Sequence, residues 1–377
     1  MLKSRFSYYL AASLLLGVAG CSDGSDDDAN DSPPSFSYDE MGPYPVGNQT
    51  ISVMNASEGR ALTVEIWYPA ESAQATQSIQ DFAGDETERD EIMALLVTVP
   101  EQCTRRETSS SQGSQPAASP ATLPLVIFSH CYECTRYSSF SLAERMASHG
   151  IVVAAPDHTR NTLFDSGAML SVEFLATRAS DVSAVLDELL TENSQVLPES
   201  LQGRFDAERV GVAGHSYGAV TAGKVLQDDP RFKAGLIIAA PFESPIFPGV
   251  SAANVEDPLL FMVAVEDNSI GSIGNTFLRA NYEAAVGPAW KIEIADAGHW
   301  SFSDIAGIVP QFNAGCGDGE RQTVPGEPFT YIDNVLSRDI TATYGMLFFA
   351  AHLLGDQDAE QALSVSTLPD IVAVQVK

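Results

Sequence analysis

Residues 209–223 decide the fold of this chain, and they read RVGVAGHSYGAVTAG. The apolar run at 210–213 predicts a buried strand, and the small residues that follow Gly218 predict a helix. Between them lies Ser216, in a tight turn where Gly214 and Gly218 leave no side chain to meet the strand or the helix. A strand, a sharp turn and a helix in this order are typical of the turn that presents a nucleophilic serine. We therefore expect Ser216 to be the reactive residue.

From residue 124 onward, short apolar runs alternate with helical patterns. Strands are expected at residues 124–129, 150–155, 210–213, 236–239, 259–265 and 291–295. Helices are expected at residues 140–149, 174–190, 217–227 and 276–285, with a final helix at 340–354. Apolar strands separated by helices indicate a mostly parallel sheet that is buried on both faces. The sequence therefore predicts an α/β fold with a mostly parallel central sheet and helices on both faces.

The segment before this alternating region is expected to add a hairpin and an insertion. Runs that favour β-structure at 51–54 and 61–68, on either side of Gly59, predict the hairpin. Residues 88–97 carry apolar residues at helical spacing. Residues 108–122 are rich in Ser, Gln, Pro and Ala, which predicts a surface loop.

The chain has 377 residues, and one domain with insertions accounts for that length. Residues 21–44 are expected to be a flexible acidic tether, because Asp, Ser, Gly and Pro cannot bury enough apolar surface to fold. We assign residues 45–377 to a single catalytic domain, with an insertion near 70–122 and a candidate lid loop near 305–334.

Residues 1–20 are expected to be a targeting segment, because Lys3 and Arg5 precede an apolar run that is too short to span a bilayer. The following residues, 16–21, read LGVAGC and resemble the lipobox of bacterial lipoproteins, whose cysteine is acylated. Cys21 is therefore the expected lipidation site, and an ordinary cleaved signal peptide is the alternative. The expected location is the periplasm or the cell surface, with a lipid anchor at Cys21, or secretion in the alternative.

The formal net charge is -30, from 50 acidic against 20 basic residues. Such a balance argues against nucleic acid and against an anionic membrane surface as partners. It does not distinguish one reaction from another.

One of the five cysteines is Cys21, and the others are Cys103, Cys131, Cys134 and Cys316. Outside the cytoplasm an even number of cysteines favours disulfides, with more than one pairing open. Cys131 and Cys134 form a CxxC pair, but no second CxxC and no His-x3-His accompanies it. A zinc site is therefore disfavoured, and we expect structural disulfides.

A serine nucleophile needs a base, and the base needs an acid that orients it. After this kind of turn the acid comes next along the chain and the histidine last, which leaves His299 and His352 as candidates. His352 lies in an apolar helical stretch and is expected to pack there. His299 directly follows the strand at 291–295, at the edge where such sheets carry their reactive groups. We expect His299 to be the base.

Two carboxylates directly follow the strand at 259–265, and they are Glu266 and Asp267. Their position places them at the same edge of the sheet as Ser216 and His299. We expect Asp267 to be the acid, because Glu266 lies nearer the strand and its longer side chain suits a short reach less well. Glu266 is the alternative.

Acyl transfer also needs two donors for the oxyanion that forms on the substrate. The backbone N–H of Tyr217, the residue after the nucleophile, is the expected first donor. The second is expected from the loop at 129–132, where we choose Cys131. His130 in the same loop is expected to support the loop with its ring.

Four segments resemble the branch of α/β-hydrolases that contains platelet-activating-factor acetylhydrolases and dienelactone-hydrolase-like enzymes. They are residues 125–130, 156–158, 214–218 and 297–303, and the resemblance covers about residues 45–355. It implies an α/β-hydrolase fold, the triad of Ser216, Asp267 and His299, and no metal or organic cofactor. The family usually has glycine where this chain has Cys131. A disulfide from Cys131 or Cys134 is expected to hold the loop rigid in place of that glycine.

Aromatic residues beside the base predict the wall of a substrate pocket. Trp300 and Phe302 would give an apolar surface near the scissile bond, and His158 is a further candidate. Residues 305–334 contain Cys316 and several glycines. This segment is expected to form either a lid or cleft wall, or a surface loop tied by a disulfide.

A narrower resemblance is to the periplasmic oxidised poly(vinyl alcohol) hydrolases, which cleave β-diketones with a serine triad. It rests on the lipobox, the acidic tether, the GHSYG turn at 214–218 and the cysteine in the oxyanion loop. The same serine attack can cleave a carbon–carbon bond beside a carbonyl, with an enolate as leaving group. The expected function is therefore hydrolysis of small or polymeric carboxylic esters through an acyl-enzyme. The alternatives are β-diketone hydrolysis and, less favoured, a lipoprotein that binds without catalysis.

Overall fold

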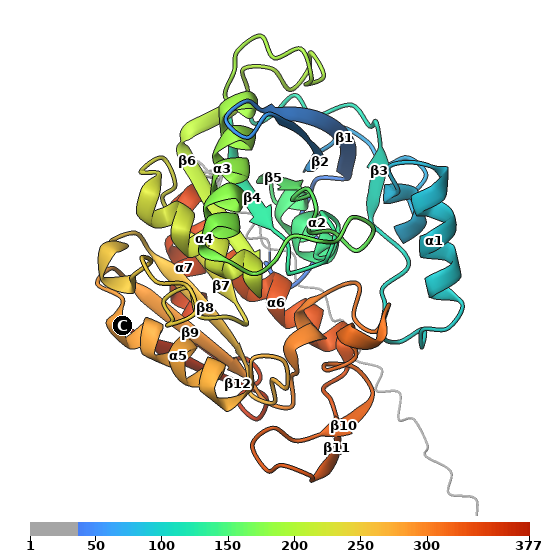
Figure 1. Ribbon diagram of the computed structural model, residues 1–377. Helices are drawn as coiled ribbons and strands as arrows, with labels where there is room; N and C mark the ends of the chain where they lie inside the picture. Colours follow the sequence, from blue (N-terminus) through green and yellow to red (C-terminus); the bar gives the residue numbers. More distant parts are fainter. Residues whose placement is uncertain (1–36) are drawn as a thin grey trace, which may run out of the picture. The chain divides into compact units, whose positions relative to one another are not determined.

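The computed structural model describes residues 37–377, and its central feature is a ten-stranded mixed sheet (Figure 1). The strands of this sheet are β1 (Val46–Asn55), β2 (Arg60–Pro69), β3 (Ser110–Gln112), β4 (Leu123–Ser129), β5 (Val152–Pro156), β6 (Phe205–His215), β7 (Gly235–Ile238), β8 (Leu259–Ala264), β9 (Ala289–Ile294) and β12 (Val372–Val376). Their order is β12-β9-β8-β7-β6-β4-β5-β2-β1-β3. From β5 to β9 all neighbours are parallel. The β1–β2 hairpin and β12 add antiparallel pairs at the two sides.

Helices cover both faces of the sheet (Figure 1). The helices are α1 (Glu86–Leu96), α2 (Phe140–Ser148), α3 (Val172–Leu189), α4 (Tyr217–Asp228), α5 (Gly271–Ala284), α6 (Asn334–Phe349) and α7 (Gln357–Leu363). Short 3₁₀ turns occupy Ile79–Phe82, Ala252–Asn254, His299–Phe302 and Pro310–Phe312, and a π-helical turn at Ala350–Leu354 extends α6. Apolar residues of α2 and α6 pack on one face, and those of α3, α4 and α5 pack on the other.

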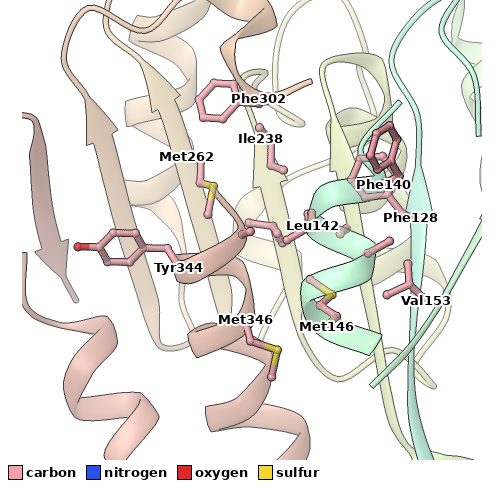
Figure 2. Packing of buried hydrophobic residues seen from close by; sticks show 14 of the residues in the cluster. Phe128, Phe140, Leu142, Met146, Val153, Ile238, Met262, Phe302, Tyr344 and Met346 are labelled. Carbon is pink, nitrogen blue, oxygen red and sulfur yellow. The ribbon is translucent and has the colours of Figure 1, made fainter. Parts of the chain in front are cut away.

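The parallel strands are apolar throughout because both of their faces are buried. In β8, Leu260 and Met262 belong to the layer of α2 and α6, whereas Leu259, Phe261 and Val263 belong to the opposite layer. Figure 2 shows the first layer, in which Met262 lies among side chains of α2 and α6. Both faces of β8 are thus buried, as the continuous apolar run at 259–265 predicted.

Local signals set where the main helices begin. Ser171 precedes α3, and its side chain accepts the N–H of Phe174. Asp333 precedes α6 and accepts the N–H of Leu336 in the same way. Such caps satisfy a backbone donor that the first turn of a helix leaves free.

The predicted α/β fold is confirmed, since every strand and helix expected after residue 124 is present. β6, α5 and α6 begin five or six residues earlier than predicted. The expected hairpin is also present as β1 and β2. Three elements near the carboxyl end were not predicted: α7, β12 and a small hairpin of β10 (Asp318–Glu320) and β11 (Pro328–Thr330). In Figure 1 this small hairpin lies at the periphery, away from the central sheet.

The prediction of a surface loop at 108–122 is wrong in part. This segment contains β3, which pairs with the outer edge of β1. Ser110 and Ser111 are buried there, and Glu144 of α2 accepts the N–H groups of Ser109 and Ser110. The strand is polar in sequence but buried, because side chains satisfy its backbone.

The predictions at the amino-terminal end lie mostly outside the described residues. The targeting segment, Cys21 and the first part of the tether are among residues 1–36. The last residues of the expected tether are ordered against the domain, because the Tyr38 hydroxyl donates to Asp356 at 2.6 Å and the N–H of Tyr44 donates to Ser148. Residues 38 and 44, which the prediction placed in a flexible tether, therefore bind the domain. Within residues 37–377, no helix has the length and apolarity needed to cross a bilayer.

Candidate active site

Ser216 joins β6 to α4 in a strained backbone conformation, with φ 56° and ψ -120°. The left-handed region is costly for a residue with a side chain, so neighbouring contacts must hold it. The N–H of Ser216 donates to Ile238 at 2.8 Å, and the carbonyl of Ser216 accepts from Ala219 at 2.9 Å. The turn thereby presents the Ser216 hydroxyl, which is half-buried, at the carboxyl edge of the sheet.

The two glycines of the turn are required by close backbone approach. A Cβ atom on Gly214 would lie 2.1 Å from the carbonyl oxygen of Gly218. A Cβ atom on Gly218 would lie 1.8 Å from the carbonyl oxygen of Ser129. The turn can therefore pack against itself and against the end of β4 only without side chains at these positions.

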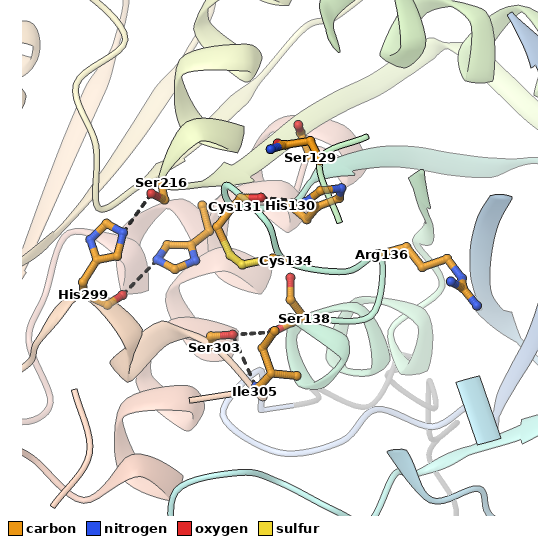
Figure 3. Close-up of a disulfide and its surroundings, with 12 residues drawn as sticks. Ser129, His130, Cys131, Cys134, Arg136, Ser138, Ser216, His299, Ser303 and Ile305 are labelled. Carbon is orange, nitrogen blue, oxygen red and sulfur yellow. Dashed lines mark hydrogen bonds between the residues drawn. A yellow bond between two sulfur atoms is a disulfide. The ribbon is translucent and has the colours of Figure 1, made fainter. Parts of the chain in front are cut away.

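The structure brings Ser216, His299 and Asp267 together in one chain of hydrogen bonds. His299 Nε2 lies 2.8 Å from Ser216 Oγ, and His299 Nδ1 lies 2.7 Å from Asp267 Oδ2 (Figure 3 draws the first of these contacts). The other oxygen of Asp267 accepts the N–H groups of Ser269 and Ile270, each at 2.9 Å. A carboxylate held in this way keeps the proton of His299 on Nδ1 and leaves Nε2 free to take the proton of Ser216.

Glu266, the alternative acid, points away from His299 and binds the segment at 305–334. Its two oxygens accept the hydroxyl of Thr323 at 2.6 Å, the N–H of Thr323 at 2.9 Å and the guanidinium of Arg321 at 3.1 Å. Burial raises the pKa of Glu266, but these hydrogen bonds outweigh it and hold the pKa below its ordinary value. Glu266 therefore anchors a neighbouring segment, and the carboxylate that contacts His299 is that of Asp267.

His215 supports the base from behind. Its Nε2 donates to the carbonyl oxygen of His299 at 2.9 Å, and it is fully buried. Burial and the neighbouring His299 lower the pKa of His215 well below its ordinary value, so the ring is neutral. The sequence did not predict this role, because a histidine next to Ser216 carries no local signal that shows which group it binds.

Trp300 and Phe302 do not form the open pocket wall that the sequence suggested. Both are buried, and the Trp300 ring stacks on Phe312 with centroids 3.8 Å apart. The edge of His299 meets the Trp300 ring at 5.4 Å, nearly perpendicular. These aromatic residues instead fix the turn His299–Phe302 from its buried side.

The segment at 305–334 is bound to the residues that follow His299, and it does not lie free above the site. A disulfide joins Cys103 to Cys316. Next to it, the N–H of Trp300 donates to Ala314 at 2.9 Å, and the hydroxyl of Ser301 donates to Gly315 at 2.9 Å. The sequence left open a lid or cleft wall and a surface loop tied by a disulfide. The geometry favours the loop tied by a disulfide.

The second disulfide joins Cys131 to Cys134 in the loop after β4, beside Ser216 and His299 (Figure 3). The prediction of two disulfides is confirmed, and the structure decides the pairing. Within residues 37–377, the N–H groups of Cys131 and Tyr217 have no protein acceptor. Both are therefore free to donate to a ligand, as the expected oxyanion donors must be.

His130 holds the same loop, as predicted. Its Nδ1 donates to the carbonyl oxygen of Cys131 at 2.7 Å, and its Nε2 accepts the N–H of His158 at 3.1 Å. Burial, reinforced by the nearby Arg178, lowers the pKa of His130 well below its ordinary value. A neutral ring that both donates and accepts therefore fixes the loop.

The prediction that His158 lines a substrate pocket is wrong. The side chain is completely buried, with Nε2 at 2.9 Å from Ser129 Oγ and Nδ1 at 2.8 Å from Asp181 Oδ2. Asp181 also binds Arg60 at 2.6 Å. His158 thus belongs to a polar network beneath the oxyanion loop, and no ring nitrogen is left for a substrate.

The surface beside Ser216 carries exposed apolar side chains. The carbonyl of Ser171 accepts the Tyr217 hydroxyl at 3.1 Å, which places the loop before α3 next to the nucleophile. In this loop Met169 is 78% exposed, and beside Phe247, which stacks on Tyr217, Ile246 is 72% exposed. An apolar surface of this kind suits a hydrophobic substrate.

No group of three or more potential metal-ligating side chains occurs within residues 37–377. The chemistry that the site offers is that of a serine activated by a histidine and a carboxylate, with two backbone donors nearby.

Two family models match the chain. The first is described as platelet-activating factor acetylhydrolase, isoform II, and matches residues 35–174. The second is described as PET hydrolase-like and matches residues 111–305, a range that contains Ser216, Asp267 and His299.

Individual relatives have low sequence identity to this chain, and the match covers only part of each relative. A platelet-activating factor acetylhydrolase from Cavia porcellus is 23% identical over 269 residues, which is 59% of this chain and 58% of the relative. Cutinase est1 from Thermobifida alba is 35% identical over 115 residues, which is 30% of this chain and 34% of the relative. The chain therefore spans between a third and three fifths of the length of these relatives.

A solved structure of ferulic acid esterase from Streptomyces cinnamoneus superposes with a TM-score of 0.67 at 23% identity. The superposition covers 89% of this chain and 96% of the esterase. At this identity the likeness establishes the fold.

Proposed function

Because the chain belongs to the PET hydrolase-like family of α/β-hydrolases, we propose that it is a serine hydrolase that cleaves carboxylic esters. Ser216 is the nucleophile, His299 the general base and Asp267 the orienting acid. The observation that carries this proposal is the continuous chain of contacts, 2.8 Å from Ser216 Oγ to His299 Nε2 and 2.7 Å from His299 Nδ1 to Asp267 Oδ2.

In the first half of the reaction, Ser216 Oγ attacks the carbonyl carbon of the ester and its proton passes to His299 Nε2. The carbonyl electron pair moves onto oxygen, and the oxyanion accepts the N–H groups of Cys131 and Tyr217. When the oxyanion collapses, the bond to the alcohol breaks and the alcohol leaves with the proton from His299. The acyl group remains on Ser216, and Asp267 stabilises the imidazolium form in between.

The second half repeats these steps with water. His299 takes a proton from a water molecule, whose oxygen attacks the acyl carbon. A second oxyanion forms and collapses, the proton returns to Ser216, and the carboxylic acid leaves. No metal or organic cofactor takes part in this proposal.

The apolar surface beside the nucleophile supports a substrate with a hydrophobic part. Met169 and Ile246 are strongly exposed, and they lie in the two segments that contact Tyr217 through Ser171 and Phe247. Among the relatives, the cutinases and the acetylhydrolases carry names of ester hydrolases. We therefore extend the proposal to small or polymeric esters with an apolar group next to the scissile bond.

The test is turnover of short p-nitrophenyl esters by the purified protein and by Ser216→Ala. We expect the variant to lose at least about 10³-fold in kcat, because the covalent step is removed. Ser272→Ala, an exposed serine in the first turn of α5, is the matched control and should keep full activity. A fluorophosphonate probe should label the wild type and Ser272→Ala but not Ser216→Ala. Labelling of all three, or of none, would refute the assignment and leave a protein that binds without catalysis.

We propose hydrolysis of β-diketones as the alternative reaction, because the GHSYG turn at 214–218 and the cysteine in the oxyanion loop resemble those of the oxidised poly(vinyl alcohol) hydrolases. Ser216 would attack one carbonyl, and the carbon–carbon bond would break with an enolate as leaving group, which takes its proton from His299. The test is cleavage of a simple 1,3-diketone, which is measured as the loss of its ultraviolet absorbance. Turnover of esters with no turnover of any diketone would eliminate this second reaction.

We also propose that the protein is anchored to a membrane through an acylated Cys21, on the periplasmic or cell-surface side. The support is the lipobox-like LGVAGC at 16–21, which lies outside the described residues. In a bacterial host, the wild type should incorporate labelled palmitate and sediment with membranes, and Cys21→Ser should do neither. Palmitate incorporation by both proteins would exclude Cys21 as the site.

A further inference from the structure

Arg178 is a completely buried arginine in α3 that reaches the loop carrying Cys131. Its guanidinium donates to the carbonyl oxygen of His130, and also to Ser129 Oγ at 3.0 Å. The remaining donors go to Asn161 Oδ1 at 2.6 Å and to Thr221 Oγ1 at 3.0 Å. All four acceptor residues are buried.

Every hydrogen-bond acceptor of Arg178 is neutral, and within residues 37–377 it has no carboxylate in ion-pair contact. Asp181, one turn further along α3, is already bound by Arg60 and His158. Burial lowers the pKa of Arg178 to about 9. By contrast, the buried Arg136 is paired with three carboxylates, at 2.6 Å, 3.1 Å and 3.9 Å. The charge of Arg178 is thus only weakly compensated in a place where charges act strongly.

The carbonyl that Arg178 binds belongs to the same peptide unit as the N–H of Cys131. A hydrogen bond from a cation to the C=O of a peptide polarises the whole unit and makes its N–H a stronger donor. We infer that Arg178 is a positioning residue that strengthens the oxyanion hole by polarising the His130–Cys131 peptide from behind. The inference rests on the proposed function, because it needs Cys131 to donate to the oxyanion.

Arg178 also contacts the other side of the oxyanion hole. Its guanidinium lies over the ring of Tyr217, 4.7 Å from the centroid, and Thr221, which it binds, donates to the carbonyl of Tyr217 at 3.0 Å. The N–H of Tyr217 opens α4, so the helix dipole already polarises it. Arg178 therefore contacts residues on both sides of the oxyanion hole.

The test compares charge at position 178 while the packing is kept. Arg178→Met and Arg178→Gln are neutral, and Arg178→Lys keeps a charge without the planar fork. For p-nitrophenyl esters we expect the neutral variants to lose about 10- to 100-fold in kcat with KM nearly unchanged, which is less than the loss when a donor is removed outright. The kcat of Arg178→Lys should lie between that of the neutral variants and that of the wild type. If Arg178→Met does not fold, the comparison of Lys with Gln decides: equal kcat values in these two would overturn the inference.

A transition-state analogue gives a measurement that would not change if Arg178 only stabilised the fold. A trifluoromethyl ketone labelled with ¹³C at its carbonyl should add to Ser216 and form a hemiketal oxyanion. Its ¹³C shift reports the pKa of the hemiketal, which we expect to rise by about one unit in the neutral variants, equivalent to a tenfold loss. An unchanged hemiketal pKa would overturn the inference even if kcat fell.

Arg204→Met is the matched control. Arg204 also donates to backbone carbonyls, those of Pro120, Ala121 and Ser200, but it directly precedes β6, at the opposite end of this strand from Ser216. It should change the unfolding midpoint without changing the hemiketal pKa. Absence of any adduct in the wild type would refute the proposed function itself, whereas adducts with equal pKa in all variants would refute only the role of Arg178.

Discussion

Asp267 uses both of its oxygens, and this explains why it rather than Glu266 meets the base. One oxygen binds His299, and the other accepts two backbone N–H groups in the turn that follows β8. Glu266, one residue earlier, points to the other side of the same turn and binds Thr323 and Arg321. Adjacent positions in a turn face different ways, so neighbouring carboxylates take different partners.

The variant Asp267→Asn should test this assignment. An amide can donate to His299 Nδ1, which would favour the tautomer that carries its proton on Nε2 and cannot accept the proton of Ser216. We expect kcat to fall about 10³- to 10⁴-fold with little change in KM, measured with p-nitrophenyl esters. Glu266→Gln is the control and should keep kcat close to the wild-type value. A larger loss in Glu266→Gln than in Asp267→Asn would reverse the two roles.

The order of Ser216, Asp267 and His299 along the chain, each at the carboxyl end of a strand, was readable from sequence. The positions of His158 and Arg178 were not. A polar residue after a strand or on an amphipathic helix suggests an exposed side chain, and only the packing reveals that these two are buried among other polar groups. Burial of a polar side chain depends on partners far away in sequence, such as Asp181 for His158 and the His130 carbonyl for Arg178.

Among the elements, β3 is a strand that is held by a buried polar side chain, although its sequence lacks the apolar pattern of a strand. The segment around Ser110 carries no alternation that would indicate a strand. It is held by Glu144 of α2, whose oxygen accepts N–H groups at 2.7 Å and 3.0 Å, and by parallel pairing with β1. Burial raises the pKa of Glu144 from its ordinary value of 4.5 to about 7, against the opposing effect of Arg105 and of the hydrogen bonds.

This raised pKa predicts a specific dependence of stability on pH. The folded protein keeps the proton of Glu144 where the unfolded chain has released it, so the contribution of the protonated group is complete below about 4.5 and is lost as pH rises through about 7. Glu144→Gln is permanently neutral and should show a smaller decrease in the free energy of unfolding across this interval. Urea unfolding at a series of pH values measures the difference.

The matched control is Glu91→Gln, an exposed glutamate of α1, which should keep the pH dependence of the wild type. If Glu144→Gln and the wild type have parallel pH profiles between about 4.5 and 7, the buried carboxyl is not the group responsible.

The elements that escaped prediction lie at edges. β12 is mostly exposed and is defined by its antiparallel pairing with β9, which no local pattern reveals. The hairpin of β10 and β11 is short and polar, and Glu266 and Asn268 hold it from the turn after β8. Central strands can be recognised in the sequence as apolar runs, because both of their faces are buried. Whether an edge segment forms a strand depends on the strand that it pairs with, which the local sequence does not show.

At the scale of the whole molecule, the net charge of -30 works against compactness. Like charges repel in the folded state, and salt weakens this repulsion because the Debye length falls from about 30 Å at 0.01 M to about 3 Å at 1 M. We expect the Tm to rise between these concentrations of NaCl, as measured by circular dichroism. A Tm that is flat or falls with salt would mean that local ion pairs outweigh the overall repulsion.

The disulfide between Cys103 and Cys316 closes a loop with a sequence separation of 213. Ser216, Asp267, His299 and the loop at 129–132 all lie inside that ring. A protease that cuts the chain once at any exposed site within the ring therefore produces two fragments that remain covalently joined. Such nicked protein should migrate as one species on a denaturing gel and separate into two only after reduction, so a single early cut need not release any part of the site.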